Sequence, residues 1–258
     1  MIEEVNISDG YYHNIRAFIE IPWKEKEPFP TIIICHGLTS NPAYPVDSHP
    51  IYRKISNALV NAGFMTVRFN FTMEMEKDIA TFHLKSEEHD LKKVISFLLD
   101  YDKADNKKIG VVGHSYGATT LLLISHENNH IKAVSALAPR INLGEEYGQH
   151  PWHLEAQEKG FFTHNAHDKV WKISKHFFEE NFKHHWRLQH AIKKIKVPLQ
   201  IIYGTGDEED TVEAEAIKIL NKHAITIPIE KTNHEFTTTA WGLDSAAKYV
   251  IDFFRKNL

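Results

Sequence analysis

The feature that most constrains this chain is the pentapeptide Gly113-His114-Ser115-Tyr116-Gly117, which directly follows the apolar run 109–112. A short continuous apolar run is typical of a strand that is buried on both faces of a sheet. The stretch 118–125 that comes next has the composition of a helix. A Gly-x-Ser-x-Gly segment between a strand and a helix predicts a sharp turn that exposes the serine hydroxyl. Glycine is required on either side because the strand and the helix crowd these Cα positions.

Apolar runs and helical periodicities alternate along most of the chain. Besides 109–112, strands are expected at 5–7, 15–21, 32–35, 64–69, 131–137, 197–203 and 225–229. Apolar residues at helical spacing fall within 51–62, 91–99, 214–220 and 247–254. Strands separated by helices imply right-handed crossovers and a mostly parallel sheet. We therefore predict a single α/β domain over residues 1–258, with an eight-stranded sheet flanked by helices.

The segment 140–195 interrupts this alternation after the sixth strand, since it shows no strand pattern and is rich in aromatic residues. A structureless loop of this length is uncommon in a compact domain. We expect a small helical insertion here. Its tryptophans are Trp152, Trp171 and Trp186.

Two further polar residues follow apolar runs in the second half of the chain. Asp207 comes after the run 197–203, and His234 comes after the run 225–229. A serine hydroxyl is a weak nucleophile at neutral pH and needs a base within hydrogen-bond reach. An acid that orients the histidine completes such a set. Asp210 is the alternative acid, and His223, which precedes a strand, is the weaker alternative base.

The order serine, acid, histidine, together with a strand at 31–35 that ends in His36-Gly37, resembles the α/β-hydrolase superfamily. Within it, the stretch 36–41 and the run 173–211 are similar to small bacterial and archaeal carboxylesterases, which include the feruloyl (cinnamoyl) esterases. The resemblance implies a triad of Ser115, Asp207 and His234, since Asp207 fits the Gly-x-x-Asp pattern that starts at Gly204.

The same resemblance assigns the remaining site residues. The backbone N–H groups of Leu38 and Tyr116 form the oxyanion hole. The insertion 140–195 becomes a cap over the site, in which Trp152, Trp171 and Trp186 contact the substrate. His36 and His114 are further candidates for substrate contact, although a support of the oxyanion loop (His36) and packing (His114) are the preferred interpretations.

The stretch Thr72-Met73-Glu74-Met75-Glu76-Lys77 departs from the family, because related esterases carry a glycine-rich Arg-Gly-x-Gly-x-Ser loop there. This change, together with 38–47, offers a second location for substrate specificity. The expected activity is hydrolysis of carboxylic esters through an acyl-enzyme. A thioesterase or an acyltransferase on the same triad is the alternative, and a non-catalytic receptor of the same fold is disfavoured because the triad is intact.

Composition limits the partners and cofactors. The net charge is −4 and no block of Lys and Arg occurs, so the sequence lacks the basic patch that is typical of nucleic-acid-binding proteins. The single cysteine, Cys35, excludes an intrachain disulfide and is expected to be a buried apolar residue. No apolar run reaches the ~18 residues of a membrane helix, and the acidic start lacks the character of a secretory signal. We expect a cytoplasmic protein that acts on a small-molecule ester, with a homodimer as one option for its assembly.

Histidines are frequent in this chain, which has 18 of them. Four close pairs could bind a metal if they were helical: 126/130, 150/153, 164/167 and 184/185. No acidic or cysteine ligand recurs beside them at a fixed spacing. We therefore expect neither a metal nor an organic cofactor.

Overall fold

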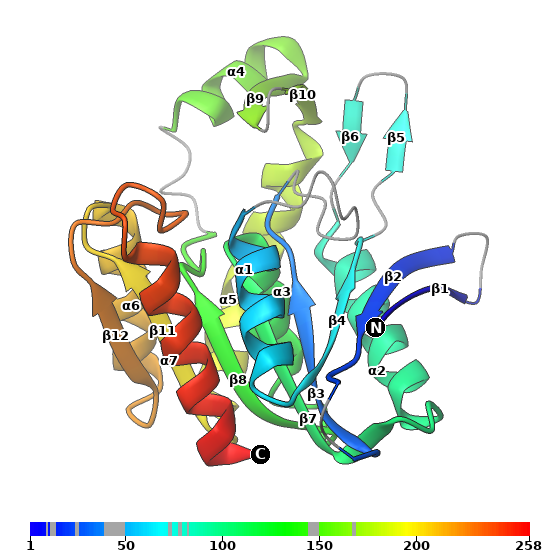
Figure 1. Cartoon of the computed structure of the whole chain (residues 1–258). Coiled ribbons are helices and arrows are strands. Elements are labelled where there is room, and N and C mark those ends of the chain that lie inside the picture. Colours follow the sequence, from blue (N-terminus) through cyan, green and yellow to red (C-terminus); the bar gives the residue numbers. More distant parts are fainter. Residues whose placement is uncertain are drawn as a thin grey trace.

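A central sheet with helices on both faces forms the body of the molecule (Figure 1). The computed structural model describes residues 1–258 except 9, 11–13, 24–25, 39–49, 72–73, 77–78, 82, 144–149 and 167–168. The strands of this sheet lie in the order β1 (Ile2–Ser8), β2 (Asn14–Glu20), β4 (Met65–Phe69), β3 (Phe29–Cys35), β7 (Ala104–His114), β8 (Ile131–Leu137), β11 (Leu199–Gly204) and β12 (Ile225–Ile229). The predicted eight-stranded sheet is confirmed.

The direction of the strands determines at which edge of the sheet their carboxyl ends lie. The first two strands form the expected antiparallel hairpin, and β2 is also antiparallel to β4. From β4 to β12 the neighbouring strands are parallel. The carboxyl ends of β3, β7, β11 and β12 therefore share one edge of the sheet, which is where open α/β folds bind ligands.

The helices bury the two faces of the sheet in two apolar clusters. Helices α1 (Pro50–Asn61) and α7 (Gly242–Asn257) cover one face, while α2 (Leu84–Leu99), α3 (Tyr116–Ile124), α5 (His176–Lys194) and α6 (Glu208–Leu220) contribute to the cluster on the other. Successive residues of β3 alternate between them: Ile33 packs in the cluster of α2 and α3, and Ile34 in that of α1 and α7. This two-sided burial explains why the central strands show as uninterrupted apolar runs. None of the helices in the described residues is long and apolar enough to cross a bilayer.

The segment 140–195 is not purely helical, which corrects the expectation from the sequence. It contains α4 (Pro151–Lys159) and α5, but also the strands β9 (Phe161–Ala166) and β10 (Lys169–Ser174), which pair antiparallel. The hairpin buries one face, through the cross-strand pair Phe162 and Ile173. Because few residues of the hairpin are buried, its apolar pattern was too weak to identify the two strands.

These two strands belong to a second sheet, with the order β5-β6-β10-β9 (Figure 1). Its other members are β5 (Glu74–Glu76) and β6 (Ile79–Thr81), and β6 runs parallel to β10. The stretch 72–77, where the glycine-rich loop of related esterases is missing, thus contributes a strand to this sheet. Residues 72, 73, 77 and 39–47 of the alternative specificity region lie outside the described part of the chain.

Candidate active site

Ser115 lies at the turn between β7 and α3 with a strained backbone. Its φ of 55° and ψ of −122° are rarely adopted by a residue with a side chain. A Cβ on Gly113 would lie 2.8 Å from the carbonyl oxygen of Gly117, and a Cβ on Gly117 would lie 2.2 Å from that of His36. Only glycine fits at either position, so the pentapeptide forms the tight strand-to-helix turn that the sequence predicted.

The loop after β3 lies directly against this turn. A Cβ on Gly37 would approach the Cβ of Ser115 to 3.0 Å. The Gly37 N–H donates to the Tyr52 hydroxyl at 2.7 Å. This places the start of the loop, which continues into the half-buried Leu38, beside the half-buried Ser115.

His36 holds this loop rather than facing an open site. Its Nδ1 lies 2.7 Å from the carbonyl oxygen of Gly37, and its Nε2 accepts from the N–H of Phe71 at 3.0 Å. Burial lowers the pKa of His36 to about 4, so the ring is neutral at neutral pH. With Nδ1–H as the donor, both hydrogen bonds are satisfied by a single tautomer.

His114 connects the loop after β3 with the loop that carries His234. Its Nδ1 lies 3.2 Å from the Tyr52 hydroxyl, and its Nε2 lies 2.9 Å from the carbonyl oxygen of His234. A continuous chain of hydrogen bonds therefore runs from Gly37 through Tyr52 and His114 to His234. In both histidines that were candidates for substrate contact, both ring nitrogens have hydrogen-bond partners within the protein.

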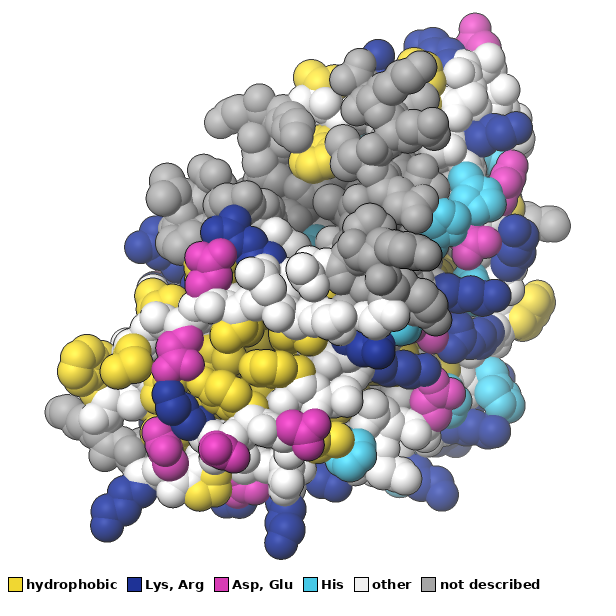
Figure 2. Space-filling model, turned by 90° about the vertical axis from the view of Figure 1, so that its right-hand side faces the viewer, with side chains coloured by type: hydrophobic (Ala, Val, Ile, Leu, Met, Phe, Trp, Pro, Cys, Tyr) yellow, Lys and Arg dark blue, Asp and Glu magenta, His cyan; other side chains and the backbone are white. Residues whose placement is uncertain are grey.

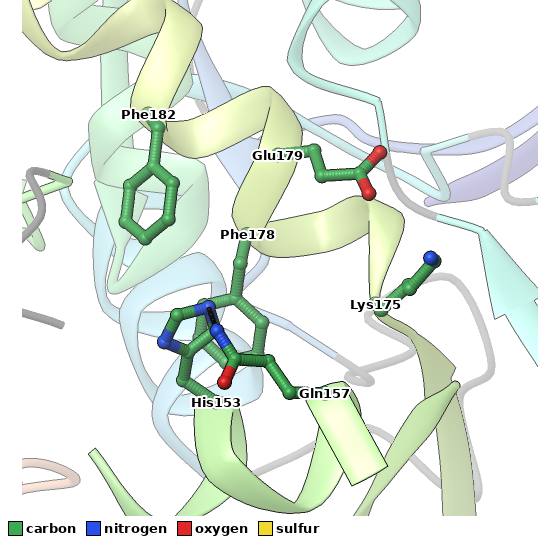
Figure 3. A pocket seen from close by; sticks show the side chains of 6 residues that line it. All are labelled: His153, Gln157, Lys175, Phe178, Glu179 and Phe182. Carbon is green, nitrogen blue, oxygen red and sulfur yellow. Dashed lines mark hydrogen bonds between the residues drawn. The ribbon is translucent and has the colours of Figure 1, made fainter. Parts of the chain in front are cut away.

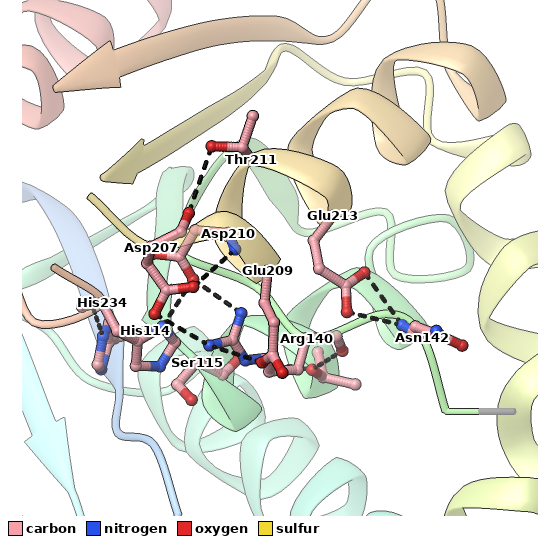
Figure 4. A network of polar contacts seen from close by, with 11 residues as sticks. His114, Ser115, Arg140, Asn142, Asp207, Glu209, Asp210, Thr211, Glu213 and His234 are labelled. Carbon is pink, nitrogen blue, oxygen red and sulfur yellow. Dashed lines mark hydrogen bonds and ion pairs between the residues drawn. The ribbon is translucent and has the colours of Figure 1, made fainter. Parts of the chain in front are cut away.

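Two glycines at and just after the end of β11, Gly204 and Gly206, allow the loop that carries His234 to pack closely against this strand end. A Cβ on Gly204 would lie 2.4 Å from the carbonyl oxygen of Thr232, and the N–H of Gly206 donates to that oxygen at 2.8 Å. This contact brings His234 over the start of α6. There its Nδ1 lies 2.8 Å from Oδ1 of Asp210, whose side chain is fully buried (Figure 4).

The acid that contacts His234 is therefore Asp210, which corrects the expectation of Asp207. Asp207 is the N-cap of α6, where its Oδ1 accepts the N–H of Asp210 at 3.0 Å. Its Oδ2 lies 3.7 Å from the guanidinium of Arg140. The hydrogen bond that Asp207 makes is a capping bond, while Asp210, one helical turn further on, reaches the imidazole.

Arg140 was not identified from the sequence, because no motif surrounds it. Its Nη1 donates to Oδ1 of Asp210 at 2.8 Å, the same oxygen that faces His234, and its Nη2 lies 3.4 Å from Glu209 (Figure 4). The carbonyl oxygen of Arg140 in turn accepts from the hydroxyl of Thr119 on α3. A charge-assisted pair of this kind fixes the position of the carboxylate.

Behind Arg140 lies a second buried carboxyl, Glu213. It accepts the N–H of Asn142 with both oxygens at 3.0 Å (Figure 4). Burial raises the pKa of Glu213 to about 7, against the opposing effect of these backbone bonds. The segment that follows β8 is thus held on α6 by two acidic side chains, Asp210 and Glu213.

The segment 140–195 touches the nucleophile turn through α5. The Tyr116 hydroxyl donates to Oδ1 of Asn181 at 2.7 Å, and its ring lies 5.4 Å from that of Phe177. Both Tyr116 and Asn181 are buried. The residue after Ser115 is thereby tied to the insertion.

The three tryptophans of the insertion lie in different surroundings. Trp152 is half-buried and stacks on Phe162 with ring centroids 5.3 Å apart. Trp171 is half-buried and packs against the same apolar cluster. Trp186, on α5, is 75% exposed. The structure therefore does not place all three around one enclosed space.

A cavity of about 260 Å³ opens between α4 and α5 (Figure 3). Its lining residues come from these two helices and the turn before α5: His153, Gln157, Lys175, Phe178, Glu179 and Phe182. The cavity includes no member of the Ser115, Asp210 and His234 group and none of the three tryptophans.

Two groups of side chains in the described residues could hold a metal. One is Asp207, Asp210 and His234, where the guanidinium of Arg140 already lies against both carboxylates. The other is His83, His176 and Glu180. The four histidine pairs noted in the sequence contribute to neither group; of them, His167 lies outside the described residues. Cys35 is buried, and burial raises the pKa of its thiol well above the usual range, as expected for an apolar core residue.

Comparison with known proteins gives consistent matches. A family model described as BD-FAE matches residues 19–223. Among curated proteins, Esterase FrsA from Yersinia pestis (strain Pestoides F) is 23% identical over 141 residues, which cover 53% of this chain and 31% of that protein. This chain thus matches less than a third of the length of that curated relative.

Several solved structures share the fold. Est1E from Butyrivibrio proteoclasticus has a TM-score of 0.76 and 21% identity, with 98% of both chains covered. DcsB, solved in complex with its substrate analogue, has a TM-score of 0.78 and 14% identity over the full length of both chains. Dienelactone hydrolase from Anabaena variabilis has a TM-score of 0.71 and 15% identity, covering 100% of this chain and 98% of its own. The predicted α/β-hydrolase fold is confirmed.

Proposed function

Since the chain belongs to the BD-FAE family, we propose that it is a serine carboxylesterase that uses Ser115, His234 and Asp210. The proposal rests on how these three residues and the Gly37 loop are arranged at the carboxyl edge of the central sheet. The strained turn places Ser115 against the Gly37 loop, and Asp210 lies 2.8 Å from Nδ1 of His234. The esterase named among the curated relatives supports the same activity.

In the proposed reaction each group has a role. With Nδ1–H donating to Asp210, Nε2 of His234 is the free basic nitrogen and accepts the proton of the Ser115 hydroxyl as Oγ attacks the ester carbonyl. The backbone N–H groups of Tyr116 and Leu38 stabilise the negative oxygen that forms. His234 then returns the proton to the leaving alcohol. Water attacks the acyl-enzyme in the same way and releases the acid and the free serine.

The substrate class follows from the insertion. Residues 140–195 act as a cap, because α5 contacts Tyr116 directly through Phe177 and Asn181. Aromatic rings near the nucleophile favour flat or medium-length acyl groups over long aliphatic chains. A structure described as ferulic acid bound to Est1E is among the similar folds, which supports aryl esters as the first compounds to test.

The decisive experiment uses Ser115→Ala with Ser245→Ala, a serine on α7, as the matched control. We expect Ser115→Ala to fold normally and to lose ester hydrolysis by several orders of magnitude, because the residual rate of triad variants comes from binding and the oxyanion hole alone. A fluorophosphonate probe should label the wild type and the control at Ser115. Labelling at another serine, or full activity of Ser115→Ala, would refute the proposal. Faster turnover of matched thioesters than of oxygen esters would change the class of substrate but keep the triad.

A further inference from the structure

Three side chains that play no part in the proposed reaction meet where the insertion joins the body of the molecule. His83 precedes α2, while His176 and Glu180 lie one helical turn apart on α5. One ligand atom of each residue lies within 4.8 Å of the ligand atoms of the other two. The rings of His83 and His176 are 4.9 Å apart.

The second sheet explains why residues so distant in sequence meet. Strand β6 runs parallel to β10, with Ile79 opposite Lys172 and Ala80 opposite Ile173. The same residue offset separates His83 from His176, so the two histidines follow their strands at equivalent positions. Each then enters a helix, α2 or α5, within one residue of its histidine.

The hydrogen bonds of His176 prepare a ligand nitrogen. Its Nδ1 lies 2.9 Å from Oε2 of Glu179, so Nδ1–H donates to that carboxylate. A histidine that ligates a metal commonly donates its other ring N–H to a carboxylate in this way. Nε2 of the neutral ring is then an acceptor, and it faces Oε1 of Glu180 at 3.9 Å. The same Oε1 lies 3.3 Å from Nζ of Lys183, so a metal ion between the imidazole and the carboxylate would take the place of that ammonium.

We propose that His83, His176 and Glu180 bind one divalent transition-metal ion, with zinc as the best match, and that the ion fastens α5 to the start of α2. Two imidazoles and one carboxylate are a common zinc ligand set, and water completes the coordination. Tetrahedral coordination with bonds of about 2.0–2.1 Å places ligand atoms roughly 3.3 Å apart, so small side-chain rotations close the site. This proposal differs from the sequence-based expectation that the protein binds no metal.

Neighbouring charges decide how readily the ion enters. Nζ of Lys183 lies 3.3 Å from Oε1 of Glu180 and would have to move, which its 62% exposure allows. Nε2 of His184 lies 3.6 Å from Oε2 of Glu180 and adds a third imidazole next to the carboxylate. On the face shown in Figure 2, histidine side chains lie among acidic and basic ones along one side. The ion pair of Arg187 with Glu88 already connects the same two helices.

The test measures zinc binding by the metal-free protein in competition with a chromophoric chelator. The variants are His176→Gln and His83→Gln, and the matched control is His190→Gln, an exposed histidine on the same helix. We expect one zinc ion per chain in the wild type and the control, and at least a 10-fold weaker affinity in each site variant, as is common when a ligand is lost. Zinc should also raise the melting temperature of the wild type, through binding to the folded state only, but not that of the site variants.

Other results would overturn the proposal. If the wild type binds no zinc at micromolar concentration, the three side chains do not form a metal site. If His190→Gln weakens binding as much as the site variants do, the ion is held elsewhere on this histidine-rich surface. Cobalt provides a second measurement, since tetrahedral coordination gives visible absorption that should be lost in His176→Gln. None of these readouts requires the proposed esterase activity, so either proposal can fail alone.

Discussion

At the scale of single residues, two aspartates one helical turn apart have different partners. Asp207 and Asp210 both lie at the start of α6, yet they face different partners. The spacing from Gly204 favoured Asp207, but a helix that begins at Glu208 uses Asp207 as its cap and turns Asp210 toward His234. The sequence contains the cap signal as well, because Asp is among the preferred N-cap residues.

The two aspartates give a matched pair of variants. We expect Asp210→Asn to lower kcat by up to ~10⁴-fold, because the amide no longer holds the imidazole in the correct tautomer. Asp207→Asn should keep most of the activity, since asparagine caps a helix as well as aspartate does. Steady-state kinetics on a p-nitrophenyl ester, with thermal melts to confirm folding, makes the comparison. A greater loss in Asp207→Asn would restore the assignment that the sequence favoured.

At the scale of elements, His36 joins the end of β3 to the residues after β4. The folded protein holds its ring neutral, with a pKa of about 4 compared with 6.5 in a solvated chain. Between these values the unfolded chain binds more protons than the folded one, so the stability from this residue is present above pH 6.5 and declines as the pH falls toward 4. The junction between the end of β3 and the residues after β4 is thus a point of acid sensitivity.

This sensitivity can be measured by urea unfolding at pH 7 and pH 5. We expect His36 to account for a loss on the order of 2 kcal/mol in the free energy of unfolding between these values. His36→Gln removes the titrating group and should show a correspondingly smaller loss, while His130→Gln, at an exposed position, should match the wild type. An unchanged difference between pH 7 and pH 5 in His36→Gln would assign the acid sensitivity to other groups.

At the scale of the whole molecule, the central sheet was predictable and the second sheet was not. Strands β8 and β12 begin and end where the sequence placed them. For β8, the continuous apolar run is the direct result of burial on both faces. The edge strand β12 shows the same kind of run although most of its residues are only partly buried or exposed. Ser115 and its glycines were equally clear, since a tight turn restricts which residues fit. Strand β10 and the pairing of His83 with His176 depend on contacts between distant segments, for which a single sequence carries no local signal.

The role of the insertion in specificity is a prediction at this same scale. We expect Trp152→Ala and Trp171→Ala to change kcat/KM unequally across esters of increasing acyl length, since each buried CH₂ contributes roughly 0.8 kcal/mol only while the pocket can hold it. Trp186→Ala serves as the control, because Trp186 is 75% exposed. Reaction with a small fluorophosphonate should stay close to that of the wild type in all three. A uniform loss on every ester would identify Trp152 and Trp171 as scaffold.

The pairing of β6 with β10 has a consequence for exchanging parts between relatives. In a chimera that replaces residues 150–175 with a loop from a protein of the same fold, β6 would lose one of its two partner strands. An unpaired strand edge is a template for aggregation. A graft of this insertion must therefore include the hairpin of β5 and β6. The two segments form one transplantable module, although about 70 residues separate them in the sequence.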